Sequence, residues 1–250
     1  DVYRISFAGV TPADWTMTKI ASLGCDTTAT CTANRKFMFA PSVVAVDGGY
    51  AILLGSGDRE KPLRYFAAAT AVSNNFFMFI DKPTTAASTY PGNAECGANI
   101  ICRASLLEIP DNSTPSASAL AAKKGWYLRL ASSEQVVTSA VTIFGVVSFS
   151  TQQPAIPVAG ACTSNLGTTL VYNVNYENAA SGNGSDVRFE DLAGDGLPPS
   201  PVAGRVALDS GETVPFCIGC SKDSPLRPTD PQPQTIDSPP KRRIFWYIQK

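Results

Sequence analysis

Short runs of alternating or continuous apolar residues dominate the chain. Residues 2–7 alternate apolar and polar side chains with the period of two that predicts a β-strand. Two apolar runs within residues 37–58 flank Asp47-Gly48-Gly49, and an Asp-Gly pair between such runs predicts a hairpin. Further strands are predicted for residues 74–81, 125–131, 136–151 with a turn at Gly145, 168–177 and 242–250.

Helical periodicity is scarce, and short helical turns are predicted only for residues 67–73 and 116–123. We therefore expect an all-β fold. Groups of strands recur over residues 37–81, 125–177 and, as a poorer copy, 198–250. Repeating units of about four strands favour the blades of a β-propeller. Three blades do not close a ring, and the sequence opens directly in a strand, so residues 1–250 are predicted to be the C-terminal part of a longer propeller domain.

The composition narrows the possible chemistry. The chain has no histidine, which excludes a Ser-His-Asp triad, a Cys-His pair and any histidine-ligated zinc. Its net charge is −1, and this near-neutral balance argues against nucleic acid as a partner, because phosphate binding needs clustered Lys and Arg side chains. No uninterrupted apolar run reaches the length of a membrane-spanning helix.

Six of the 7 cysteines form closely spaced pairs. Cys25 with Cys31 and Cys96 with Cys102 each bracket a loop-like stretch rich in Thr, Gly, Asn and Ala, so we predict two loop disulfides and an oxidising compartment. For Cys217 and Cys220 we favour a third disulfide over a redox or metal site. Cys162 remains, either free and buried or paired outside this chain.

Several segments, in this order, resemble the C-terminal domain of the PilY/PilC family. The most specific is Gly49–Leu63, which contains the string GSGDREKP. The others are Asn74–Asp81, Gly125–Leu130, Val136–Thr151, Pro154–Tyr176 and the terminal residues 242–250.

The resemblance implies a modified β-propeller related to quinoprotein dehydrogenases, with long loops carrying the disulfides. It also implies a non-enzymatic protein secreted by Gram-negative bacteria, at the pilus tip or the outer membrane surface. Such proteins promote assembly and extension of type IV pili and adhesion to host-cell or abiotic surfaces. The implied partners are minor pilins, with one copy of the protein at each pilus tip. We expect the loops of this chain to contact these partners, with residues 96–102 and 217–240 as the best candidates.

The family also has a regulatory calcium site in an acidic loop. The nearest string here supplies Asp191 and Asp195 but lacks further ligands, and no bidentate Glu follows. We interpret it as an exposed acidic turn. No cofactor is expected in this chain, and a family calcium site is expected upstream of it.

Residues 55–59 resemble a phosphate-binding loop only superficially, because the Lys and the following helix of a P-loop are missing. We predict a structural turn at Gly55, Gly57, Asp58 and Arg59, with Arg59 bridging blades through Asp81 or Glu60. The basic run 241–243 and the neighbouring aromatic residues are interpreted as the start of a packed strand.

Two other functions remain open. A periplasmic quinoprotein dehydrogenase would share the fold, but it would need adjacent cysteines, which this chain lacks. A secreted glycan-binding β-domain is the second alternative.

Overall fold

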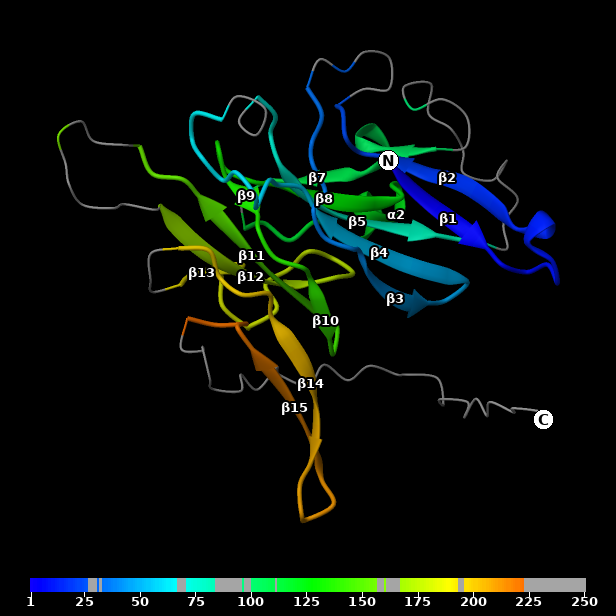
Figure 1. Ribbon diagram of the computed structural model, residues 1–250. Helices are drawn as coiled ribbons and strands as arrows, with labels where there is room; N and C mark the ends of the chain where they lie inside the picture. The colour runs from blue at the N-terminus through cyan, green and yellow to red at the C-terminus, as the bar shows by residue number, and fades with distance from the viewer. Residues whose placement is uncertain are drawn as a thin grey trace.

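The computed structural model describes residues 1–26, 31, 33–66, 71–83, 96, 100–110, 112–156, 160, 167–192 and 196–222. Over these residues the fold is all-β, as predicted (Figure 1). Helical structure among them consists of the short helix α2 (Ala117–Ala121), which lies within the predicted segment 116–123, and the 3-10 turns η1 (Pro12–Asp14) and η3 (Arg103–Ser105). The described strands form separate sheets that do not close into a barrel, in keeping with the predicted partial propeller.

The first sheet has the strand order β3-β4-β5-β8-β7, formed by β3 (Ser42–Val46), β4 (Gly49–Gly55), β5 (Asn75–Asp81), β8 (Gly125–Arg129) and β7 (Leu107–Ile109). The predicted hairpin joins β3 to β4, with Val46 opposite Gly49. Gly48 occupies the turn with a φ of 69°, a conformation that glycine adopts without steric cost.

β8 departs from the predicted grouping. It opens the second predicted unit, yet it pairs along its length with β5 of the first sheet, from Asn75 opposite Arg129 to Phe79 opposite Gly125. The division of the chain into three blade-like units stays a prediction.

The second sheet has the order β10-β11-β12-β13, with β9 also paired to β11. It comprises β9 (Gln135–Val136), β10 (Val141–Ile143), β11 (Val146–Gln153), β12 (Thr168–Asn175) and β13 (Phe189–Asp191). The predicted turn at Gly145 joins β10 to β11. β11 and β12 pair over eight residues each and form the centre of this sheet.

Two hydrophobic cores lie on opposite faces of the first sheet. Successive side chains of a strand point to opposite faces, so Phe76 enters one core and Phe77 the other. Phe76 stacks on Phe149 of β11, with ring centroids 3.8 Å apart, and so joins the first sheet to the second. On the other face, Phe77 packs in a cluster that includes Ile20, Leu23 and Leu106. The first sheet is thus the middle layer of the body.

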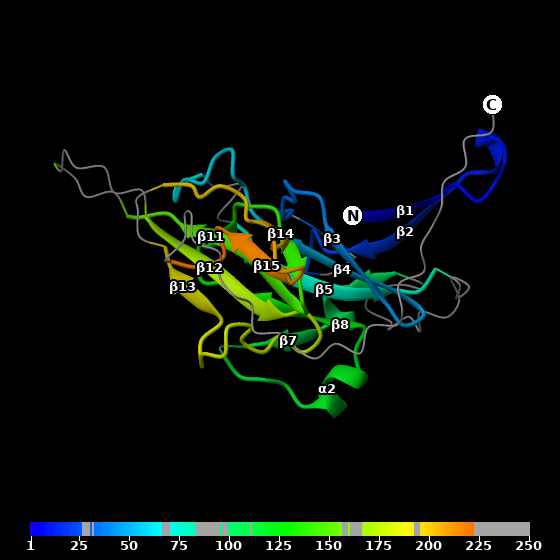
Figure 2. The same ribbon diagram turned by 90° about the horizontal axis from the view of Figure 1, so that it is seen from below.

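Two narrow ribbons extend from this body (Figures 1 and 2). One consists of β1 (Val2–Ser6) and β2 (Thr16–Ser22), with the two-residue strand β6 (Ile101–Cys102) beside the end of β2. The other is the hairpin of β14 (Val202–Ala207) and β15 (Thr213–Ile218). The sequence patterns predict β1, but they miss β2 and this hairpin.

The three predicted disulfides are present: Cys25–Cys31, Cys96–Cys102 and Cys217–Cys220. Cys162 lies outside the described residues, as do the terminal segment 223–250 and most of the loop 83–100. Over the described residues, no helix is long and apolar enough to cross a membrane.

Candidate functional site

The segment predicted as a structural turn lies where the end of β4 meets β9 of the second sheet. A Cβ atom built on Gly55 would lie 2.5 Å from a methyl group of Val136, and one on Gly57 would lie 2.3 Å from the Val136 carbonyl oxygen. Neither position has room for a side chain. The two glycines therefore let the main chains of the two sheets approach each other closely.

Asp58 is 1% exposed and lies at this junction. Its carboxylate accepts hydrogen bonds from Nζ of Lys36 at 2.5 Å and from the N–H groups of Glu60 and Lys61, each at 3.1 Å. Loss of hydration acts to raise the pKa of Asp58, but the Lys36 hydrogen bond and the two N–H groups outweigh it and hold the pKa below its usual value. The carboxylate is thus charged, and its hydrogen bonds hold Lys36 and the main chain of residues 60–61 in place.

Arg59 joins separate segments, but through other partners than we expected. Its guanidinium donates to the main-chain carbonyls of Val137 and Pro198, the latter at 2.8 Å. Asp81, one of the carboxylates proposed as its partner, instead accepts a hydrogen bond from Arg4 of β1. The four predicted turn residues thus make contacts of a structural kind.

Sequence patterns missed a buried acid that lies directly before β9 of the second sheet. Glu134 is 2% exposed, and its carboxylate accepts hydrogen bonds from the Ala131 N–H at 2.8 Å, the Thr151 hydroxyl at 2.5 Å and the Tyr172 hydroxyl at 2.9 Å. Burial, followed by the charge of Glu134, raises the pKa of Tyr172 above its ordinary range. The phenol therefore stays protonated at neutral pH and acts as a hydrogen-bond donor.

Glu134 and Tyr172 line a pocket of about 630 Å³ together with Arg188. The guanidinium of Arg188 donates to the main-chain carbonyls of Ala179 and Ser113. All three side chains therefore have hydrogen-bond partners within the protein. These hydrogen bonds hold the three side chains in place against neighbouring segments of the chain.

The described residues do not build a calcium site around Asp191. Asp191 ends β13 and is exposed, whereas Asp195 lies outside the described residues. Calcium takes about six to eight oxygen ligands. Across the described part of the chain, no group of three or more metal-ligating side chains is placed to hold an ion.

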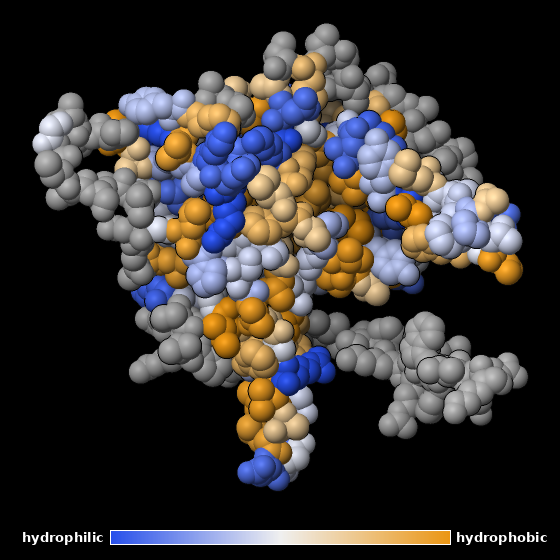
Figure 3. Space-filling view, viewed as in Figure 1, coloured by the Kyte–Doolittle hydropathy of each residue, from blue (hydrophilic) through white to orange (hydrophobic). Residues whose placement is uncertain are grey.

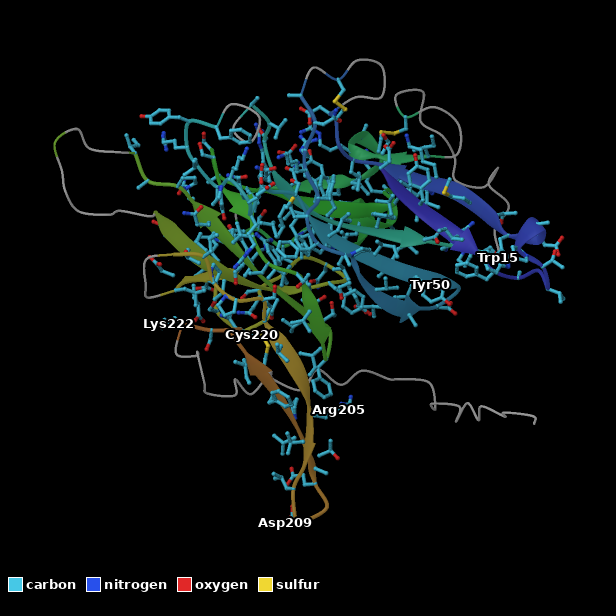
Figure 4. All side chains as sticks on the ribbon, in the orientation of Figure 1. Trp15, Tyr50, Arg205, Asp209, Cys220 and Lys222 are labelled. Atoms are coloured by element: carbon cyan, nitrogen blue, oxygen red, sulfur yellow. A yellow bond between two sulfur atoms is a disulfide. The ribbon has the colours of Figure 1, made fainter. Side chains whose placement is uncertain are left out.

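The outer face of the β1–β2 ribbon carries five large apolar side chains in the described structure. Ile5 lies opposite Met17, and the rings of Phe7 and Trp15 meet edge to face with centroids 4.8 Å apart. All are substantially exposed, with Met17 at 68% and Phe7 at 62%. We call this face the ribbon strip: Tyr3, Ile5, Phe7, Trp15 and Met17. Figure 4 shows Trp15 towards the free end of the ribbon.

The inner face of the same ribbon is fixed to the body. Arg4 donates to the carboxylate of Asp81 at the end of β5, at 2.6 Å, and Ile20 of β2 enters the second core. One face is therefore anchored and the other presented to solvent. Contiguous exposed apolar surface on a soluble protein marks an interaction site.

The β14–β15 hairpin also exposes apolar side chains, including Val202, Val206 and Leu208 (Figure 3). Its tip carries Asp209, and Arg205 nearer the base lies over the ring of Phe144 (Figure 4). By contrast, the aromatic side chains of Phe76, Phe77, Phe79 and Trp126 are all buried in the cores. Of the two loops predicted to make contacts, only residues 96, 100–102 and 217–222 are described.

No protein-family model matches this sequence, and a search of curated proteins finds no match. Among solved structures, the chain is similar to the C-terminal domain of PilY1 from Pseudomonas aeruginosa, with a TM-score of 0.51 and 13% sequence identity. This chain has a PilY1-like fold. The match covers 82% of this chain and 48% of the PilY1 chain, so it extends over about half of that structure. The resemblance found in the sequence is thus supported at the level of the fold.

Proposed function

We propose that this chain is a non-enzymatic contact module of the type IV pilus machinery, acting at the pilus tip in pilus assembly and surface adhesion. The observation that carries the proposal is the similarity of its fold to the C-terminal domain of PilY1. Three disulfides support an exported protein, because disulfides persist in oxidising compartments such as the periplasm and the cell surface.

The ribbon strip supports a role in protein contact and supplies a place for it. A two-stranded ribbon is marginally stable by itself. Burial of its apolar face against a partner removes that face from water and so stabilises the complex. We propose that the strip packs against an apolar surface of a pilin-type subunit at the tip.

The test is genetic and uses the whole protein in its own bacterium. We expect deletion of the gene to reduce the number of surface pili and adhesion to a surface, and the wild-type gene to restore both. The double variant Ile5→Lys with Met17→Lys should fold but fail to restore them, because two ammonium groups would enter the contact. Val43→Lys is the matched control, since Val43 is similarly exposed on β3, outside the strip.

Two results would oppose the proposal. Normal piliation and adhesion in the deletion strain would exclude the pilus role. Full restoration by the double variant would exclude the ribbon strip as the contact surface and leave the pilus role intact.

A further inference from the structure

A pocket of about 710 Å³ lies beside α2, where the first sheet meets the end of β12. We call it the α2 pocket. It has no part in the proposed pilus contact, and the ribbon strip contributes no residue to it. Its volume is within the range of about 300–1,000 Å³ that is typical of small-molecule sites.

The inner wall of the α2 pocket is apolar. Val46 at the end of β3, Met78 and Ile80 of β5, and Leu120 of α2 line it. The same four residues belong to the core between the two sheets or pack against it. The pocket is therefore an open extension of the core. An apolar group bound there would leave water, and this transfer would favour binding.

The polypeptide around the pocket is held in place before any ligand arrives. Lys124 accepts a main-chain hydrogen bond from Ile80 at 3.1 Å and donates one to Ser105 at 3.0 Å. A Cβ on Gly125 would lie 2.0 Å from the Met78 carbonyl oxygen, so only glycine lets this segment lie so close to β5. A site fixed in advance loses little conformational entropy on binding.

The charged residues around the pocket favour an anion. Lys82, Lys123 and Lys124 line it, against the single carboxylate of Glu177. Nζ of Lys123 donates to the Ala104 carbonyl at 3.0 Å, and Glu177 accepts a hydrogen bond from the Tyr176 hydroxyl at 3.2 Å. The positive charge of these residues exceeds the negative, and together with the apolar wall it suits a ligand with a negative head and an apolar body.

We propose that the α2 pocket binds an apolar chain that ends in a carboxylate, with the chain against Val46, Ile80 and Leu120 and the carboxylate beside Lys82 and Lys124. A fatty acid and the C-terminus of an apolar peptide share this chemistry.

Isothermal titration of the full chain with matched ligands tests the proposal. We expect n-octanoate or acetyl-Leu-Leu-Phe with a free carboxylate to bind, and binding to weaken as salt is added. n-Octanol, n-octylamine and the peptide amide should bind at least about tenfold more weakly, since they lack the negative group. Binding of octanoate alone would identify a fatty-acid site, and binding of the peptide alone a site for a chain end.

Variants locate the ligand. Lys82→Gln with Lys124→Gln should weaken carboxylate binding about tenfold, which is the effect of two partly exposed charge pairs. Lys61→Gln with Lys222→Gln removes two lysines elsewhere and should leave binding unchanged. Ala121→Trp, on the exposed side of α2, should block the pocket sterically. The proposal is overturned if neither carboxylate binds, if octanol binds as tightly as octanoate, or if Lys82→Gln with Lys124→Gln binds like the unaltered chain.

Discussion

Asp58 illustrates how a single buried charge is kept in this fold. Its carboxylate is almost inaccessible to water, but Lys36 and two main-chain N–H groups replace the lost hydration. Its own N–H donates to Oε1 of Gln135, so the residue also fixes β4 against β9. The charged state of Asp58 therefore contributes to the stability of the junction between the two sheets.

This arrangement predicts a pH dependence of stability. Because folding lowers the pKa of Asp58, its contribution is complete above about pH 4, the ordinary range of the unfolded carboxyl, and disappears as the pH falls through the folded pKa. We expect Asp58→Asn to lower the free energy of unfolding by about 2 kcal/mol at pH 7. The difference from the unaltered chain should shrink as the pH falls below 4.

Urea unfolding from pH 7 to pH 3 measures this difference. Asp209→Asn, at the exposed hairpin tip, is the control, and its free energy of unfolding should differ little from that of the unaltered chain at any pH. A constant difference between Asp58→Asn and the unaltered chain down to pH 3 would contradict the assignment.

Residue patterns predicted Gly55, Gly57 and Asp58 as a turn because glycine and aspartate carry local conformational signals. They could not predict Glu134. Its partner Tyr172 lies 38 positions away, and the pairing of β9 with β11 and of β11 with β12 brings the two together. The partners of Arg59 were also missed. They are main-chain carbonyls of residues distant in sequence, and every residue has such a carbonyl, so the residue types do not reveal which ones are bonded.

Among the elements, the disulfide Cys96–Cys102 differs from the other loop disulfide in its surroundings. Cys96 and Cys102 are both buried, and Cys102 lies in β6, which pairs with the end of β2. Cys25 and Cys31 lie nearer the surface, and neither belongs to a strand. Both disulfides close loops of equal length, with a sequence separation of 6, so chain entropy alone would make them equivalent.

We therefore expect unequal effects of removing them. Cys96→Ser with Cys102→Ser should cost about 2 kcal/mol in chain entropy and a further amount because buried hydroxyls replace buried sulfur. It should also increase hydrogen exchange in β2. Cys25→Ser with Cys31→Ser should lower the stability only by the chain-entropy contribution of about 2 kcal/mol. Equal melting temperatures and equal exchange in β2 for the two variants would contradict the structural role of β6.

Elements with strong apolar runs were predictable, and those with mixed patterns were not. β4 and β5 are almost wholly apolar and bounded by turn residues, so they could be recognised. β2 reads TMTKIAS, in which threonine and lysine obscure the alternation, and β14 contains a glycine. The ribbon strip depends on β2, so it could not be assembled from sequence alone.

At the scale of the whole molecule, β5 belongs to both cores. Phe76 packs towards the second sheet and Phe77 towards the opposite face, and both side chains are fully buried. Neither core can lose this strand without the other, so we expect the two to unfold together.

Phe76→Ala and Phe77→Ala should each lower the stability of the entire body by about 3–5 kcal/mol. Calorimetry should show one transition for both, with equal calorimetric and van't Hoff enthalpies. Val206→Ala, on the exposed hairpin, is the control. Two separate transitions, with each variant shifting only one, would show that the cores are independent.

The attachment of the β1–β2 ribbon has a mechanical consequence. Its two strands are antiparallel and joined by hydrogen bonds that run across them, while Arg4 and Ile20 hold its inner face to the body. A pull along the strands loads all of these hydrogen bonds at once, in shear. A pull across the strands breaks the hydrogen bonds one after another. The ribbon would therefore resist tension along its own axis much better than tension sideways, and the direction in which a bound partner pulls would decide how long the attachment lasts.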